Sequence, residues 1–255
     1  MSIVFFDYFK LIRKIEDEGF SNNIENPNYT LVINEAVTEP LFNYITLNKL
    51  SNYNETVKNL IESAKEMIKR NKQPLVYLPC IKDTKQIIDN LHKDYFNLVS
   101  KDSFLLFKDK SFLSREIDCP QDIKFSETFD ANTYAYAVYD NFNSLVTKYD
   151  LYGGLEEEYI PGIINSFNNI NGLIKHHYIA KHNDKIVATL TISIDKKTMI
   201  GGLANASTLG SYRCKHIGIK LLQYALIDCF DKGMKNVLLI ILKIIKNIIL
   251  NRFKF

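Results

Sequence analysis

Residues 198–242 read as a strand, a helix and a second strand, and this succession limits the fold more than any other part of the chain. TMIGGLANASTL (198–209) has the pattern of a strand, and NVLLIIL (236–242) is a short apolar run typical of a buried strand. Lys232 and Gly233 are expected to end the helix between them. The apolar face of that helix comprises Ile217, Leu221, Leu222, Ala225, Leu226 and Cys229. Together these elements form a βαβ unit.

The loop that enters this helix is basic and contains a glycine. A helix N-terminus presents N–H groups without intrahelical partners and a partial positive charge, which together favour an anion. Gly218 would let such a ligand approach closely, and Arg213 and Lys215 would add positive charge at its rim. The loop contains neither G-x-x-x-x-G-K-[ST] nor G-x-G-x-x-G, so neither nucleotide-binding loop is supported. The loop has the features of an anion-binding site, and a pyrophosphate placed there would satisfy its free donors.

Composition limits the classes of partner. The chain has 255 residues, of which 46% are hydrophobic and 24% charged, the balance of a globular chain that can bury a core. Its formal net charge of +3 gives no general case for nucleic acid. The cysteines form no C-x-x-C pair and the histidines do not fall at metal-ligand spacings, so we expect reduced thiols, no metal and a cytoplasmic location. The first residues resemble neither a signal peptide nor a membrane span.

The rest of the chain also alternates strands and helices. In the first half we predict strands at 29–36 and 42–49, a helix at 54–70, a strand at 73–80 and a helix at 84–98. After a polar stretch come a strand at 122–129, a helix at 130–146, a helix at 155–169 interrupted by Pro161, and two strands within 176–195. Asn183 and Asp184 form the turn between those strands. Gly201 and Gly202 predict a bulge or a close backbone approach.

A family resemblance follows from the loop. RCKHIG (213–218) resembles the Q/R-x-x-G-x-G/A acyl-CoA pyrophosphate loop of the GCN5-related N-acetyltransferases, the GNAT superfamily, and GGLANASTLGSYR (201–213) resembles the strand that leads into it. The order of elements from Asp122 to Leu242 agrees with that family. The resemblance implies an α/β fold with a mixed sheet. Residues 120–255 would be the acetyltransferase domain, and residues 1–119 a smaller αβ subdomain like the degenerate N-terminal half of two-part GNAT proteins.

The same resemblance implies a site for acetyl-CoA. Main-chain groups of the strand around residues 204–208 would face the pantetheine arm, and backbone N–H groups of the loop would hold the pyrophosphate. His216 stands where the family usually has its first glycine, so its side chain must point away from the phosphates or donate to them. The implied cofactor-binding residues are Ala206, Ser207, Thr208, Arg213, Cys214, Lys215, His216, Ile217, Gly218 and Ile219.

The implied reaction is direct attack of an amine, from a small molecule or a peptide, on the acetyl thioester. Asn205 lies on the strand that the resemblance places at the site, but it cannot accept a proton at neutral pH; it would order a water or bind the acceptor. The sequence leaves the catalytic base open among several side chains. The candidates are Glu156, Glu157, Glu158, His176 and His177, with Asn205, Glu157 and His177 retained as catalytic candidates.

The C-terminal end departs from the family pattern. No tyrosine follows Tyr224 to serve as the general acid, and the chain ends soon after Leu242, so we expect a truncated domain with weakened activity. Without a further strand, NVLLIIL would keep an unpaired edge and favour a homodimer. The alternative function is a catalytically inactive protein that binds CoA or a protein partner.

Overall fold

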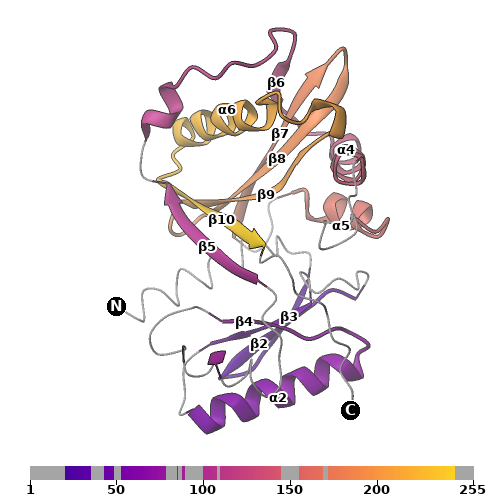
Figure 1. Cartoon of the computed structure of the whole chain (residues 1–255), viewed down its shortest axis with the longest axis vertical. Helices are drawn as coiled ribbons and strands as arrows, with labels where there is room; N and C mark the ends of the chain where they lie inside the picture. Colours follow the sequence, from indigo (N-terminus) through magenta and orange to yellow (C-terminus); the bar gives the residue numbers. More distant parts are fainter. Residues whose placement is uncertain are drawn as a thin grey trace. The chain divides into compact units, whose positions relative to one another are not determined.

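The computed structural model describes residues 21–35, 43–48, 53–78, 85, 88–89, 100–107, 110–144, 155–168 and 172–244 (Figure 1). The described residues fall into two compact units. The N-terminal unit contains those between residues 21 and 105 together with residues 240–244, and the C-terminal unit contains those between 106 and 239. Residues 245–255, the predicted truncated end, and most of the predicted helix at 84–98 lie outside the described residues; Lys85, Ile88 and Asp89 are helical.

The N-terminal unit is a four-stranded sheet with one described helix. Its sheet order is β1-β2-β3-β4, with antiparallel pairs except for parallel β3 and β4. Leu31, Ile33 and Ile45 from the sheet pack against Leu60 and Met67 of the helix. The elements are β1 (Asn22–Glu25), β2 (Tyr29–Ile33), β3 (Tyr44–Leu47), α2 (Tyr53–Lys69) and β4 (Leu75–Tyr77). The predicted strands and first helix are thus confirmed, whereas β1, which is polar and exposed, has no sequence signal.

The second sheet has six strands in the order β5-β10-β9-β8-β7-β6. Strand β10 pairs in parallel with β9, and β6 to β9 are mutually antiparallel, which makes the sheet mixed as predicted. The elements are β5 (Ser100–Phe107), η2 (Lys110–Ser114), β6 (Lys124–Glu127), α4 (Ala131–Asn143), α5 (Tyr159–Ser166), β7 (Leu173–His182), β8 (Lys185–Asp195), β9 (Ile200–Thr208), η3 (Gly210–Tyr212), α6 (Ile217–Asp231) and β10 (Asn236–Ile244).

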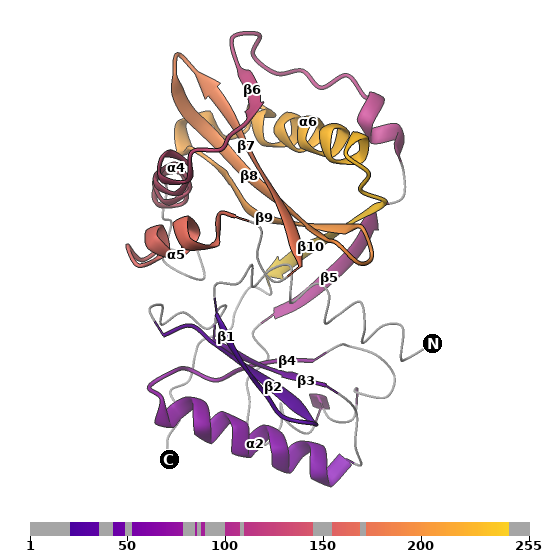
Figure 2. The same ribbon diagram turned by 180° about the vertical axis from the view of Figure 1, so that it is seen from behind.

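Helices cover both faces of this sheet: α6 lies on one face, and α4 and α5 lie on the other (Figures 1 and 2). Side chains that alternate along each strand supply the two cores. Tyr178, Leu190 and Ile192 pack under α6 against Leu221 and Leu226. On the opposite face, Ile179 packs with apolar residues of α4 and α5, namely Tyr134, Ala135, Val138 and Ile163, and with Phe167.

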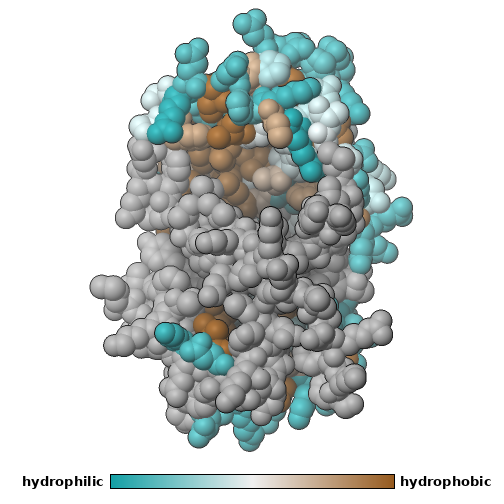
Figure 3. Space-filling view, viewed as in Figure 1, coloured by the Kyte–Doolittle hydropathy of each residue, from teal (hydrophilic) through white to brown (hydrophobic). Residues whose placement is uncertain are grey.

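In the space-filling view, apolar surface, coloured brown, lies over the region that Figure 1 draws as α6 (Figure 3). This helix exposes the side chains of Ile219 and Ile227.

One local prediction is confirmed and one is corrected. Asn183 and Asp184 both have positive φ, 46° and 63°, as a two-residue hairpin turn requires. The helix with Pro161 is shorter than predicted: it begins at Tyr159, because proline is tolerated in a first turn, where its missing N–H has no intrahelical acceptor.

Of the two alternatives predicted for Gly201 and Gly202, the close approach applies and the bulge does not. Gly201 and Gly202 are in regular register with β8, whereas Asn205 and Ala206 together face Leu190 of β8. Asn205 has a φ of 51°, in the left-handed region that asparagine tolerates better than most residues. The expected close approach is confirmed at Gly201, where a Cβ atom would stand 2.5 Å from the Met234 sulfur.

The prediction that β10 keeps an unpaired edge is wrong, because β5 pairs with it. The pairing strand precedes the family-like segment in sequence, whereas the prediction considers only a strand after β10. The argument for a homodimer through this edge therefore loses its premise.

Candidate functional site

The loop between β9 and α6 has the geometry of an anion-binding turn. Cys214 and His216 have φ of 60° and 58°, and Arg213 between η3 and these residues is extended. Such alternation turns successive N–H groups toward one side. Among the described residues, nothing accepts a hydrogen bond from the N–H groups of residues 214–219. These donors are therefore available to a ligand at the start of α6.

Gly218 keeps this turn open. It is exposed, and a Cβ atom there would lie 3.0 Å from Oγ1 of Thr208, the last residue of β9. A side chain at position 218 would therefore press on the Thr208 hydroxyl. Because glycine has no Cβ atom, a diphosphate can approach the backbone closely at this point.

The basic side chains of the loop are held by the protein. Nε of Arg213 donates to the Thr208 carbonyl at 3.0 Å, and Nη2 donates to that of Asn141 at 3.5 Å. The ammonium of Lys215 lies 5.0 Å from the centre of the Tyr212 ring. Nδ1 of His216 donates to the Asp118 carbonyl at 3.0 Å, so this nitrogen bonds to the protein. The backbone rather than these side chains provides the donors at the centre of the turn.

Tyr212 connects the loop to the far end of the β7 strand. Its hydroxyl lies 2.8 Å from Nδ1 of His182, and Nε2 of His182 lies 2.5 Å from Oδ2 of Asp122. This chain of contacts holds η3 against the sheet.

The predicted cofactor residues differ in exposure. Ala206, Cys214, Lys215, His216, Gly218 and Ile219 are exposed, and Ser207, whose hydroxyl lies 2.6 Å from that of Thr189, and Thr208 are half-buried. Ile217 is buried in the core under α6, so its side chain anchors the helix and only its backbone N–H can reach a ligand.

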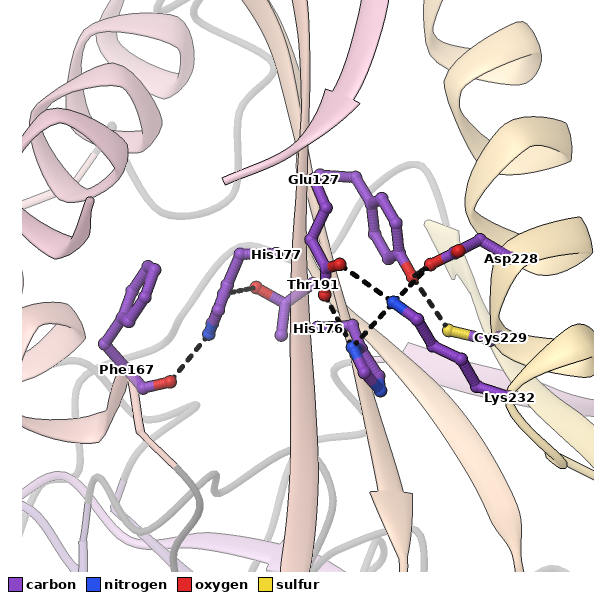
Figure 4. Close-up of polar contacts among 9 residues, drawn as sticks. Glu127, Phe167, His176, His177, Thr191, Asp228, Cys229 and Lys232 are labelled. Atoms are coloured by element: carbon purple, nitrogen blue, oxygen red, sulfur yellow. Dashed lines mark hydrogen bonds and ion pairs between the residues drawn. The ribbon is translucent and has the colours of Figure 1, made fainter. Parts of the chain in front are cut away.

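A buried polar cluster lies beside the bulge, on the α4 and α5 face of the sheet. Nδ1 of His177 lies 3.0 Å from Oγ1 of Thr191, and Nε2 of His177 lies 2.8 Å from the Phe167 carbonyl oxygen (Figure 4). Thr191 Oγ1 is also 2.7 Å from the Tyr134 hydroxyl and 3.4 Å from Nδ2 of Asn205. The structure thus brings together two of the three catalytic candidates, Asn205 and His177.

The geometry does not favour His177 as a base. It is only 4% exposed, and both ring nitrogens have protein partners. Burial lowers its pKa to about 4, although the hydrogen bond to the Phe167 carbonyl opposes the shift. The imidazole is therefore neutral at physiological pH and poorly able to take a proton.

Glu157, the third candidate, lies in the turn before α5. It is exposed, and its carbonyl accepts a hydrogen bond from the N–H of Ile160. Glu156 occupies the same turn, and Glu158 precedes the first residue of the helix. No contact among the described residues joins the Glu157 side chain to His177 or Asn205.

His176 belongs to a separate ionic network on the α6 face. Glu127 lies 2.6 Å from His176 Nδ1 and 2.8 Å from Lys232 Nζ, which in turn lies 2.6 Å from Asp228 (Figure 4). Asp228 also accepts a hydrogen bond from the Tyr178 hydroxyl at 2.5 Å. Burial raises the pKa of the Tyr178 hydroxyl, so it remains protonated. No local sequence pattern signals this network, whose members come from β6, β7, α6 and the residue that caps α6.

The comparison with protein families decides the class of this domain. Residues 139–244 match the family model described as Acetyltransferase (GNAT) family. This segment is a GNAT domain. The resemblance found in the loop is thereby confirmed, and the match includes β7 to β10, the bulge and the basic turn. No curated protein matches the chain significantly.

Solved structures share the GNAT fold over most of the chain. A GCN5-related N-acetyltransferase from Kribbella flavida has a TM-score of 0.62 at 13% identity, covering 90% of this chain and 84% of its own. A functionally unknown conserved protein from Staphylococcus epidermidis has a TM-score of 0.60 at 12% identity, covering 89% and 85%. A tandem GNAT protein from the clavulanic acid biosynthesis pathway has a TM-score of 0.56 at 10% identity, covering 86% and 70%.

Within the described residues, no helix is long and apolar enough to cross a membrane. The described residues likewise contain no group of three or more side chains suited to hold a metal ion.

Proposed function

We propose that this chain is an acetyl-CoA-dependent N-acetyltransferase whose acceptor is an amine of a small molecule or a peptide. The observation that supports this most is the turn at residues 213–219. It combines free N–H groups, two left-handed residues and a glycine at the helix start, within a segment that matches the GNAT family. These features suit a diphosphate, and the ten predicted cofactor residues would hold acetyl-CoA.

When bound, acetyl-CoA supplies an activated acetyl thioester. In direct attack, the acceptor nitrogen forms the new C–N bond while the C–S bond breaks, the nitrogen loses a proton, and the thiolate leaves and is protonated. The chain would contribute orientation of the two reactants and polarisation of the carbonyl, which are large terms in such reactions. Backbone groups of β9 beyond Gly202 would align the thioester arm.

Removal of the ammonium proton requires a base. The described side chains that contact Asn205 are the hydroxyl groups of Thr189 and Thr191, and neither is a base at neutral pH. Of the candidates from sequence, Glu157 offers an exposed carboxylate and remains the proposed base. A solvent water ordered by Asn205 would pass the proton to it.

The absence of a base among the described contacts of Asn205 supports a second candidate function. A site whose described contacts lack a base suits a protein that binds CoA or a protein partner without catalysis.

We also propose that residues 1–119 form a degenerate GNAT-like subdomain, a proposal supported by the likeness to a tandem GNAT protein over 86% of the chain. Free Cys119, Cys214 and Cys229 suit a reducing compartment such as the cytoplasm.

Two measurements test the proposed function. Acetyl-CoA should raise the melting temperature of the purified chain, and free thiol should be released when spermidine, tyramine or a lysine-containing peptide is added. A thermal shift without thiol release would support the inactive CoA-binding protein. No shift at millimolar acetyl-CoA would overturn the proposed cofactor site, and with it both the acetyltransferase and the CoA-binding protein.

A further inference from the structure

The polar cluster beside the bulge allows only one arrangement of protons. A carbonyl oxygen accepts but cannot donate, so Nε2 of His177 must carry the proton that it donates to Phe167. Because a neutral imidazole has one N–H, Nδ1 of His177 must accept. The hydroxyl of Thr191 therefore donates its single proton to Nδ1 of His177.

This assignment orients the side chain of Asn205. With its proton committed to His177, Thr191 Oγ1 can only accept from its other neighbours. The Tyr134 hydroxyl must donate to it at 2.7 Å, and the contact at 3.4 Å with Asn205 must come from the amide nitrogen. The carboxamide nitrogen of Asn205 thus points inward and its oxygen points the opposite way.

The backbone of Asn205 is held as firmly as its side chain. Its carbonyl accepts from the Thr189 hydroxyl at 2.9 Å, and its left-handed φ of 51° belongs to the bulge. Asn205 is only half-buried, and among the described residues none donates to its Oδ1. A held carboxamide that presents an unused acceptor is suited to bind an N–H donor.

We propose that His177 is a positioning residue: through Thr191 it orients Asn205 so that Asn205 Oδ1 accepts a hydrogen bond from the acceptor amine. The proposal rests on the proposed function and names the side chains that would orient its amine. His177, which is buried and neutral, would thus contribute to the reaction without transferring a proton itself. The bond to the amine would be made by Asn205, while His177 and Thr191 would act only through it.

The chain offers matched variants for a test. His177→Phe keeps an aromatic ring at a position that stacks on Phe167 with ring centres 3.9 Å apart, but removes both nitrogens. Tyr178→Phe is its control, because it removes a buried hydroxyl from the next residue of β7 on the opposite face of the sheet. Thr191→Val removes the linking hydroxyl, and Thr191→Ser keeps it.

Steady-state kinetics with the best amine among spermidine, tyramine and the lysine-containing peptide give the decisive comparison. His177→Phe, Thr191→Val and Asn205→Ala should each lower kcat/KM for the amine by about tenfold, with KM for acetyl-CoA within about twofold of wild type. Thr191→Ser should restore most of the activity lost in Thr191→Val. Tyr178→Phe should reduce the melting temperature but not kcat/KM.

Other results would overturn the proposal in distinguishable ways. Equal kcat/KM for Thr191→Val and Thr191→Ser, or an equal loss in Tyr178→Phe and His177→Phe, would mean that the cluster only supports the fold. A loss confined to KM for acetyl-CoA would assign the cluster to the cofactor instead. Failure of the wild-type chain to acetylate any of the amines would defeat the proposed function itself, and this role of Asn205 with it.

Discussion

His216 donates from Nδ1 to the carbonyl oxygen of Asp118, 98 residues earlier in the chain, while its own backbone adopts a φ of 58°. The side chain is thus drawn to the protein at a position where the family pattern has glycine. The left-handed backbone explains why glycine suits this position, and the hydrogen bond to Asp118 gives the histidine side chain a partner in the protein.

His216→Gly should therefore be tolerated better than His216→Ala. Both variants lose the bond to Asp118, but only alanine retains a Cβ atom in a left-handed conformation, at a cost of about 1 kcal/mol. Denaturant unfolding should show the glycine variant as the more stable of the two by about that amount, with a thermal shift on acetyl-CoA addition like that of wild type. The reverse order of stability would contradict the backbone described for residue 216.

Gly218→Val and Arg213→Ala should affect cofactor binding unequally. A valine would crowd Thr208 and cover the loop N–H groups, so the thermal shift with acetyl-CoA should disappear. Arg213 donates to carbonyl groups at the rim, so its loss should weaken binding by no more than about tenfold. Calorimetric titration of both variants would measure this. A larger loss of acetyl-CoA affinity in Arg213→Ala than in Gly218→Val would mean that the guanidinium, and not the backbone N–H groups, provides most of the binding free energy.

Gly201→Ala should destabilise the fold without touching the proposed site. The new Cβ atom would lie 2.5 Å from the Met234 sulfur and 3.3 Å from Cγ2 of Ile192, so side chains must shift. Overpacking of this kind costs about 1 to 3 kcal/mol. In a Met234→Ala background the same change should cost much less, and the two residues should show coupling in a double-mutant cycle. Additive effects would argue against the contact.

Protonation of His177 should contribute to acid sensitivity. Its pKa is lowered to about 4 in the folded state, mainly by burial, whereas the unfolded value is near 6.5. The unfolded chain therefore binds more protons between these values, so stability is full above about pH 6.5 and falls as the pH drops toward 4. The loss from this residue approaches about 3 kcal/mol. Urea unfolding from pH 7 to 4.5 should show a shallower decline in His177→Phe than in wild type.

The sequence predicts the local elements of the C-terminal unit better than their partners. The helix face from Ile217 to Cys229, the Asn183 and Asp184 turn and the basic loop all depend on spacing or on nearby residues, which a sequence displays directly. The pairing of β5 with β10 joins segments more than a hundred residues apart, and no local pattern encodes it.

The candidate site shows the same division. The cofactor loop is contiguous and carries a motif, so its residues could be found from the sequence. The environment of His177 depends on Thr191 from β8, Tyr134 from α4 and the Phe167 carbonyl after α5, which only the fold brings together. Burial and a lowered pKa follow from those neighbours, and for this reason the sequence could not separate His177 from the other candidate bases.

The alternation of His177 and Tyr178 along β7 makes the site intolerant of length changes in that strand. Deletion of one residue before position 177 would bring the tyrosine against Thr191, and insertion of one residue there would move the imidazole into the apolar layer beneath α6. A hairpin extended at Asn183 would leave both faces unchanged. Insertions should therefore be tolerated at the hairpin tip but not within residues 173–177, both in natural variants and in engineered ones.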